Sequence, residues 1–318
     1  MEEYASAGLV ALVQRALAVE GISTVAPRSG GALLPFQAKH RFLRDVAREH
    51  GLLPLLRAGS ALSSDTSDPA VSALLSAVTP HDLFERWQRL ERFTHSRHRV
   101  MVRERGAEHL VAEHVGPPGA PPDPAEDALV LGVLTALLAL RGVRDIRVAA
   151  GRGAPVTVYS DGVFLAPPPP RDSALWRFGW SRTPLPADPR ARVLGRDEIS
   201  RTRRLLAADP ARRWTLGRLS DELGIPPRSL QRRLADAGGF SGLLGRVRTE
   251  TAAELLMRGD HPVSVIGFVC GYADQPHFTR HFKLRTAMTP AAYRSAFRRP
   301  APGARRLLTP EPTKGTTP

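Results

Sequence analysis

Apolar residues recur at helical spacing in two short segments of the last third of the chain. Positions three, four or seven residues apart lie on one side of an α-helix. Each segment therefore predicts a short helix with one apolar face, formed by Leu216, Leu219 and Leu223 in the first and by Val263, Ile266 and Val269 or Cys270 in the second.

A glycine follows each of these short helices, Gly224 in the first case and Gly271 in the second. Glycine has the permissive backbone that a tight turn requires. The segment after each glycine is rich in polar and basic residues and keeps a few apolar anchors, which are Leu230, Leu234, Phe278 and Phe282. The pattern predicts two helix-turn-helix units, each with a second helix whose polar face is free to enter a major groove.

The segment Phe240–Met257 has leucines and alanines at helical spacing and predicts one long helix between the two units. A helix of about 18 residues spans roughly 27 Å. Two recognition helices about 34 Å apart would enter successive major grooves on one side of the duplex.

These segments together resemble the AraC/XylS family of bacterial transcription regulators, from about Leu205 to Arg298. The blocks that carry the resemblance are LSDELGIPPRSLQRRLADAG, AAELL, GYADQPHFTRHFK and MTPAAYR. The resemblance implies an all-α DNA-binding domain with two helix-turn-helix units joined by a long helix.

Three residues of the second unit depart from the family pattern. Gly267 stands where the family prefers alanine, and it costs about 1 kcal/mol of helix propensity. Pro276 stands where serine is frequent. Ala287 stands where glycine is usual, which indicates a helix end that needs no left-handed residue or that is strained.

The start of the first recognition helix supplies four candidate DNA contacts, which are Arg228, Ser229, Gln231 and Arg232. They match positions that read bases or touch the DNA backbone in the family. Arg232 could instead be a structural arginine that pairs with Asp221 or Glu222.

In the second unit the same argument expects exposed side chains at Gln275, His277, Thr279 and Arg280. Gln275 and His277 are assigned to base edges, and Thr279 and Arg280 to phosphate. Asp274 is expected to cap the helix rather than to read a base. Thr289, before Pro290, predicts another helix start, where backbone N–H groups could meet a phosphate.

The amino-terminal region mixes helical and strand patterns. Helices are predicted over 5–20, 36–50, 69–78, 81–93 and 125–141, with a polar loop over 59–69. Alternating segments predict a hairpin across Gly106, two short strands within 144–165 and a further strand near 174–182 with Trp176, Phe178 and Trp180 on one face.

The predicted fold class is therefore mixed, with an α+β sensor or dimerisation domain at 1–190 and an all-α DNA-binding domain at 191–299. Residues 300–318, rich in Pro, Thr, Arg and Gly, are expected to form a disordered tail. The amino-terminal layout resembles the sensor domains labelled arabinose-binding-like. That class is expected to sense varied small metabolites, and the label does not indicate arabinose.

The chain has a formal net charge of +14, and the excess is uneven. Residues 196–299 hold 19 basic and 10 acidic side chains, so the predicted DNA-binding region carries most of it. Such a region attracts the phosphate backbone and binds with salt-dependent affinity. General solubility and a membrane-surface patch are the alternatives, but the charge coincides with the motifs.

Other chemistry is sparse. The single cysteine, Cys270, excludes a disulfide within the chain and a zinc site built from cysteines. It is expected to be a buried structural thiol. The candidate metal ligands are His95, His98, His109 and His114. Their pattern fits ordinary surface or core histidines better than a metal site, so no metal is expected.

Trp87, Trp176 and Trp180 could line an effector pocket but are more often core residues. No nucleophile elbow, phosphate loop or dinucleotide fingerprint is found, so we expect neither an enzyme nor a cofactor. The longest apolar run, 128–140, is too short for a membrane span, and no secretory signal opens the chain, so a soluble cytoplasmic protein is expected.

The sequence thus predicts a sequence-specific DNA-binding transcription regulator that responds to a small-molecule effector. Activation is the commoner mode of the resembled family. The expected partners are double-stranded DNA, RNA polymerase, an unidentified effector and a second copy in a homodimer, with no membrane partner. The alternatives are an enzyme fused to this DNA-binding module and a general architectural DNA binder.

Overall fold

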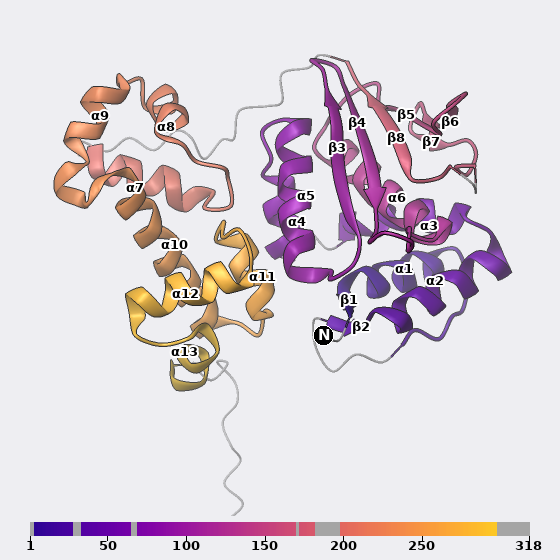
Figure 1. Cartoon of the computed structure of the whole chain (residues 1–318), viewed down its shortest axis with the longest axis horizontal. Coiled ribbons are helices and arrows are strands. Elements are labelled where there is room, and N and C mark those ends of the chain that lie inside the picture. The colour runs from indigo at the N-terminus through magenta and orange to yellow at the C-terminus, as the bar shows by residue number, and fades with distance from the viewer. Residues whose placement is uncertain (1–2, 28–32, 65–68, 170–171, 182–197, 298–318) are drawn as a thin grey trace, which may run out of the picture.

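The computed structural model describes residues 3–27, 33–64, 69–169, 172–181 and 198–297. Figure 1 shows an α+β amino-terminal region and an all-helical carboxy-terminal region, as the sequence predicts. The predicted domain boundary at 190/191 and the predicted disordered tail at 300–318 lie outside the described residues.

A six-stranded antiparallel sheet with the order β3-β4-β8-β5-β6-β7 forms one layer of the amino-terminal region. Its strands are β3 (Arg99–Arg105), β4 (His109–Val115), β5 (Arg147–Ala150), β6 (Val156–Ser160), β7 (Val163–Phe164) and β8 (Leu175–Gly179). The predicted hairpin across Gly106 is confirmed as β3 and β4. Trp176 and Phe178 of β8 point into the core, since side chains two positions apart share one face of a strand.

Helices cover this sheet and carry most of the remaining core. They are α1 (Ala7–Val19), α2 (Phe36–His50), α3 (Leu53–Arg57), α4 (Pro69–Leu75), α5 (Pro80–Thr94) and α6 (Pro124–Leu140), with a small ribbon of β1 (Tyr4–Ser6) and β2 (Leu33–Pro35). Helix α6 is buried on nearly all sides, and its start is fixed by a capping box between Asp123 and Glu126. No helix among the described residues is both long and apolar enough to cross a membrane.

The predicted polar loop at 59–69 is wrong over its first half, because Ala58–Ser64 forms a 3₁₀-helix, η1, against α6. Small residues make this close contact possible. A Cβ atom on Gly59 would lie 2.7 Å from the carbonyl oxygen of Gly132. The small residues of this segment, which indicated a loop, instead allow close packing against α6. That contact is seen only in the tertiary structure.

The carboxy-terminal region contains α7 (Glu198–Ala208), α8 (Leu216–Leu223), α9 (Pro227–Arg233), a 3₁₀ turn η3 (Ala235–Ala237), α10 (Gly239–Arg258), α11 (Val263–Val269), α12 (Gln275–Thr286) and α13 (Pro290–Phe297). Helices α8 and α9 form a first helix pair and α11 and α12 a second. The predicted long helix between them is α10, which has 20 residues.

The two helix pairs belong to different hydrophobic cores. The first pair closes its own core, in which Leu219, Leu223, Leu230 and Leu234 pack with α7 and the first half of α10. The core of the second pair is continuous with that of the amino-terminal region. Helix α11 lies against α4 and α5 (Figure 1), so the second pair is attached to the amino-terminal region through this helix.

Candidate nucleic-acid interface

The first helix pair exposes one basic and polar face. Thr215 caps α8, and Gly224 ends it with a φ of +68°, which turns the chain into α9. On α9, Arg228, Gln231 and Arg232 are exposed at spacings of three and four residues, which places them on one side of the helix. Ser229 is half-buried and lies off this face.

Arg232 is free for an external partner. The sequence left open an ion pair with Asp221 or Glu222. The structure instead pairs Glu222 with Arg212, at 2.8 Å between Arg212 Nη2 and Glu222 Oε1. Among the described residues Arg232 makes no ion pair, so the structural alternative is not supported.

The second helix pair is less open than the sequence predicts. Arg280 of α12 is exposed, but Gln275, His277 and Thr279 are half-buried. His277 Nδ1 accepts a hydrogen bond from the Ala273 backbone N–H at 3.2 Å, and its ring packs edge-on against Tyr272. The expectation that these three side chains are exposed is therefore wrong.

The predicted helix caps of the second pair are confirmed. Asp274 Oδ1 accepts from the His277 backbone N–H at 2.7 Å, and so caps α12. Thr289 Oγ1 accepts from the Ala292 N–H at 3.2 Å, at the start of α13. The side chain of Thr289 is thus occupied in the cap, so it would meet DNA only alongside that role.

Lys283, which was not among the residues predicted to contact DNA, is exposed on α12. It follows Arg280 by three residues, so the two cations share a helix face. Helical spacing could have identified it, because the α9 cations Arg228 and Arg232 also share one face, at a separation of four residues.

The connection between α7 and α8 anchors the carboxy-terminal region to α5. The buried Arg86 guanidinium donates to both carboxylate oxygens of Asp209, at 3.0 Å and 2.6 Å, and also contacts Asp82. Burial alone would lower the pKa of Arg86, but Asp209 and Asp82 outweigh it and the pKa is raised. Such a bidentate pair fixes orientation as well as charge.

A second arginine of α5, Arg89, extends this contact. It donates to the Ala211 carbonyl and lies over the Phe268 ring, 5.5 Å from its centroid. Burial and the neighbouring Arg86 and Arg248 lower the pKa of Arg89 to about 10. Arg86 and Arg89 therefore hold both the α7–α8 connection and helix α11 against the amino-terminal region.

A buried polar cluster lies at the junction of α2, α5 and α6, formed by Lys39, His95, His98 and Glu126. Ligand atoms of His95, His98 and Glu126 lie within 4.8 Å of one another, a spacing that could suit a metal ion. The sequence expected no metal and did not foresee that α6 brings Glu126 to these histidines.

The hydrogen bonds of His95 argue against a metal at this cluster. His95 Nδ1 accepts from the backbone N–H groups of Arg97 and His98, at 3.4 Å and 3.2 Å, so the neutral ring carries its proton on Nε2. Nε2 lies 2.9 Å from Lys39 Nζ. Burial, opposed by the nearby Glu126, lowers the pKa of Lys39. A metal-bound histidine donates its other ring N–H outward, but here two donors face Nδ1.

The two remaining candidate histidines each contact a single carboxylate. His114 Nδ1 lies 2.8 Å from Asp127 Oδ1 in the core, and the exposed His109 lies 3.0 Å from Glu104. Cys270 is buried and free, as predicted, and burial raises the pKa of its thiol well above the usual range.

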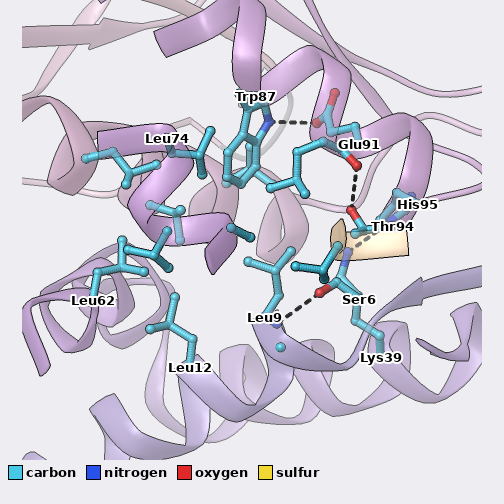
Figure 2. A pocket seen from close by; sticks show the side chains of 18 of the residues that line it. Ser6, Leu9, Leu12, Lys39, Leu62, Leu74, Trp87, Glu91, Thr94 and His95 are labelled. Carbon is cyan, nitrogen blue, oxygen red and sulfur yellow. Dashed lines mark hydrogen bonds between the residues drawn. The ribbon is translucent and has the colours of Figure 1, made fainter. Parts of the chain in front are cut away.

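A cavity lies at the seam between the two regions, lined by Trp87 among others (Figure 2). Trp87 Nε1 donates to Glu91 at 2.8 Å. Trp176 and Trp180 are buried and do not line this cavity, so of the three candidate tryptophans only Trp87 reaches it.

Comparison with known proteins identifies the carboxy-terminal region. Residues 219–296, which include most of the first helix pair and all of the second, match the family model described as a helix-turn-helix domain. The chain is 31% identical over 90 residues to the HTH-type transcriptional activator FapR of Escherichia coli, and the match covers 28% of this chain and 35% of FapR. It is 33% identical over 99 residues to the ornithine utilization regulator of Pseudomonas aeruginosa, covering 31% of this chain and 29% of the relative.

Among solved structures, a probable AraC family transcriptional regulator from Rhodopseudomonas palustris is 24% identical, with a TM-score of 0.28. That likeness covers 32% of this chain and 97% of the solved chain. The chain thus spans about a third of the length of the curated relatives it matches. The predicted resemblance is confirmed for this part of the molecule, and residues 219–296 form a helix-turn-helix domain of the AraC/XylS type.

Proposed function

We propose that this protein is a sequence-specific DNA-binding transcription regulator in which each helix pair acts as a helix-turn-helix unit. Helices α9 and α12 would enter adjacent major grooves. The observation that carries the proposal is the pair of exposed cationic faces, Arg228 with Arg232 on α9 and Arg280 with Lys283 on α12, joined by α10. The 20 residues of α10 span about 30 Å, close to the roughly 34 Å of one duplex turn.

Within these faces, Arg228 and Gln231 are assigned to base edges, Arg232 to base or phosphate contacts, and Arg280 to phosphate. Ser229 and Thr279 are half-buried and would contact the DNA backbone. Gln275 and His277 at the start of α12 would read bases, and Thr289 would lie beside a phosphate at the start of α13.

We further propose that residues 1–190 sense a small molecule or dimerise, and that residues 191–299 bind DNA. Several matched relatives are named transcriptional activators, which supports activation and contact with RNA polymerase. A cytoplasmic location follows from this function.

Selection of bound duplexes from a random pool, at physiological salt, tests the proposal. Enrichment of one site with two blocks about one helical turn apart supports two reading units. A single short block would mean that the second pair reads no bases. Equal binding of all sequences would indicate a general architectural binder, and turnover of a metabolite by the full chain would indicate a fused enzyme.

Arg228→Ala is expected to cost about 1–3 kcal/mol of binding free energy on the selected site and to relax the preference at one position. The control is Arg41→Ala, which removes an exposed arginine from α2, far from the helix pairs. Fluorescence anisotropy on the selected duplex and on a scrambled one measures both. An equal loss on both duplexes would show that Arg228 touches only phosphate.

A further inference from the structure

The cavity at the seam has a volume of about 210 Å³. Most of its wall is apolar and comes from α1, α4, α5 and α6, for example Leu12, Leu74, Trp87 and Leu137 (Figure 2). Pro262 and Val265, at the start of helix α11, complete the wall. An apolar cavity of about 150 Å³ accepts benzene, so this one has room for a substituted ring rather than for a drug-sized molecule.

One end of the cavity is polar. Lys39, Glu91, His95 and His98 line it, and all four are buried. Glu91 is already satisfied, since it accepts from Trp87 Nε1 and from the Val100 N–H. Lys39 and His95 are bonded to each other at 2.9 Å.

His98 differs from its neighbours at this end. Its side chain is 3% exposed, and its Nδ1 lies 3.2 Å from Glu126 Oε2. Among the described residues neither ring nitrogen makes a hydrogen bond of good geometry, and Nε2 also has no ion-pair contact. A buried polar atom without a partner is costly, and such atoms usually mark the place of a ligand or an ordered water.

The polar side chains at this end of the cavity determine which polar group a bound ligand can place there. A hydroxyl group can donate to Nε2, or accept from it when that nitrogen carries the proton of the ring. A carboxylate would lose its hydration at this buried end beside the Glu91 carboxylate, and only the Lys39 and Arg15 cations of the cavity wall would oppose that cost. A pure hydrocarbon would leave Nε2 without a partner.

We infer that the cavity binds a small uncharged molecule with an apolar, ring-sized body and one hydroxyl group, which is placed against His98. Because Pro262 and Val265 form part of the wall, the ligand touches the second helix pair directly. Its presence would therefore change how α11 sits against the amino-terminal region. This regulatory consequence rests on the proposed DNA-binding function, whereas the binding site does not.

The test uses three probes with a common body: 4-propylphenol, propylbenzene and 4-propylbenzoate. Isothermal titration calorimetry on the full chain measures each affinity. We expect 4-propylphenol to bind on the order of tenfold more tightly than propylbenzene, and 4-propylbenzoate to bind most weakly. Equal affinities for the phenol and the hydrocarbon would overturn the role of His98, and tighter binding of the benzoate would overturn the uncharged class.

Two variants locate the site. His98→Phe keeps the ring shape and should remove the advantage of the phenol over propylbenzene. Ala70→Trp fills the cavity, and should abolish binding of all probes, whereas Ala18→Trp on the exposed side of α1 should leave it intact. Because the Ala70 variant does not disturb the polar cluster, it remains informative if His98→Phe fails to fold.

A matched pair on α11 tests the shared wall. Val265 lines the cavity and Val269 does not, although both are half-buried valines of one helix. Val265→Ala should weaken 4-propylphenol several-fold, and Val269→Ala should not; equal effects would overturn direct contact with α11. The duplex selection is independent of these titrations, so loss of probe binding with an enriched DNA site would overturn this inference and leave the proposed function standing.

Discussion

Ala287 ends helix α12 with a φ of +61°, in the left-handed region. Its N–H donates to the Lys283 carbonyl at 2.8 Å, so the helix end requires this conformation. A residue with a Cβ atom pays about 1–2 kcal/mol in this region. Of the two alternatives that the sequence left for Ala287, the structure therefore supports the strained helix end.

Ala287→Gly is expected to raise the free energy of unfolding by about 0.5–1 kcal/mol, since relief of strain exceeds the entropy that glycine adds to the unfolded chain. Ala292→Gly, in the ordinary helical backbone of α13, should lower it by a similar amount. Urea titration of both variants measures the two changes, and a shift of the same sign in both would contradict the assignment of strain.

The buried His95 makes the stability of the protein depend on pH. Burial, followed by Lys39 and the nearby histidines His98 and His114, lowers its pKa far below the usual 6.5. The unfolded chain therefore takes up a proton below about pH 6.5 that the folded chain refuses, so stability falls as pH falls, by up to about 1.4 kcal/mol per pH unit.

Unfolding free energies between pH 7 and pH 5 check this expectation. His95→Gln keeps a polar side chain that does not titrate, so its stability should fall less steeply over this range. His50→Gln, at the exposed end of α2, is the control and should retain the slope of the parent protein. Identical slopes for the His95 variant and the parent would show that another group governs the acid response.

At the scale of elements, helix α11 explains why Gly267 stands where the family prefers alanine. A Cβ atom there would lie 2.8 Å from Phe278 Cδ1 and 2.8 Å from Phe93 Cε1. Phe278 belongs to α12, but Phe93 belongs to α5 of the amino-terminal region. Gly267 therefore lowers the helix propensity of α11 but allows this helix to pack closely against the amino-terminal region.

Gly267→Ala is expected to destabilise the protein by about 1–3 kcal/mol through overpacking, despite the gain in helix propensity. Phe93→Leu in the same chain should relieve part of this cost, because it removes one of the two clashes. Thermal unfolding of both single variants and the double variant forms the thermodynamic cycle. Strict additivity would show that Phe93 is not the neighbour that excludes alanine.

At the scale of the whole molecule, the helix pairs are held differently. The second pair shares a core with the amino-terminal region, while the first pair has its own core. The Arg86–Asp209 ion pair fixes the connection between α7 and α8 to α5 of the amino-terminal region. Any rearrangement at the seam therefore moves the second pair directly, and reaches the first pair through α10 and this connection.

Asp209→Asn is expected to lower the free energy of unfolding by about 3 kcal/mol, since it leaves the Arg86 charge partly uncompensated in the interior. It should also increase hydrogen exchange along α11 more than along α9, because only α11 is packed on α5. Asp236→Asn, an exposed change in η3, should do neither. An equal increase in hydrogen exchange along α11 and α9 would contradict the inference that the two helix pairs are attached differently to the amino-terminal region.

Local signals made much of this fold predictable. Asp274 and Thr289 are caps because their side chains reach N–H groups three residues ahead, a relation contained in the sequence itself. The apolar faces of α8 and α11 follow from spacing in the same way. Contacts such as Arg86 with Asp209 join residues far apart in the chain, and no periodicity encodes them.

The sequence by itself determined the helix pairs, the long helix between them, the exposed cations of α9 and the mixed character of the amino-terminal region, because each depends on neighbours within a few residues. Only the tertiary structure decided that α11 docks on α5, that Gly267 makes room for Phe93, and that a cavity with a polar end at His98 lies at the seam. Those features depend on which distant surfaces meet, and burial of apolar area has no direction along the chain.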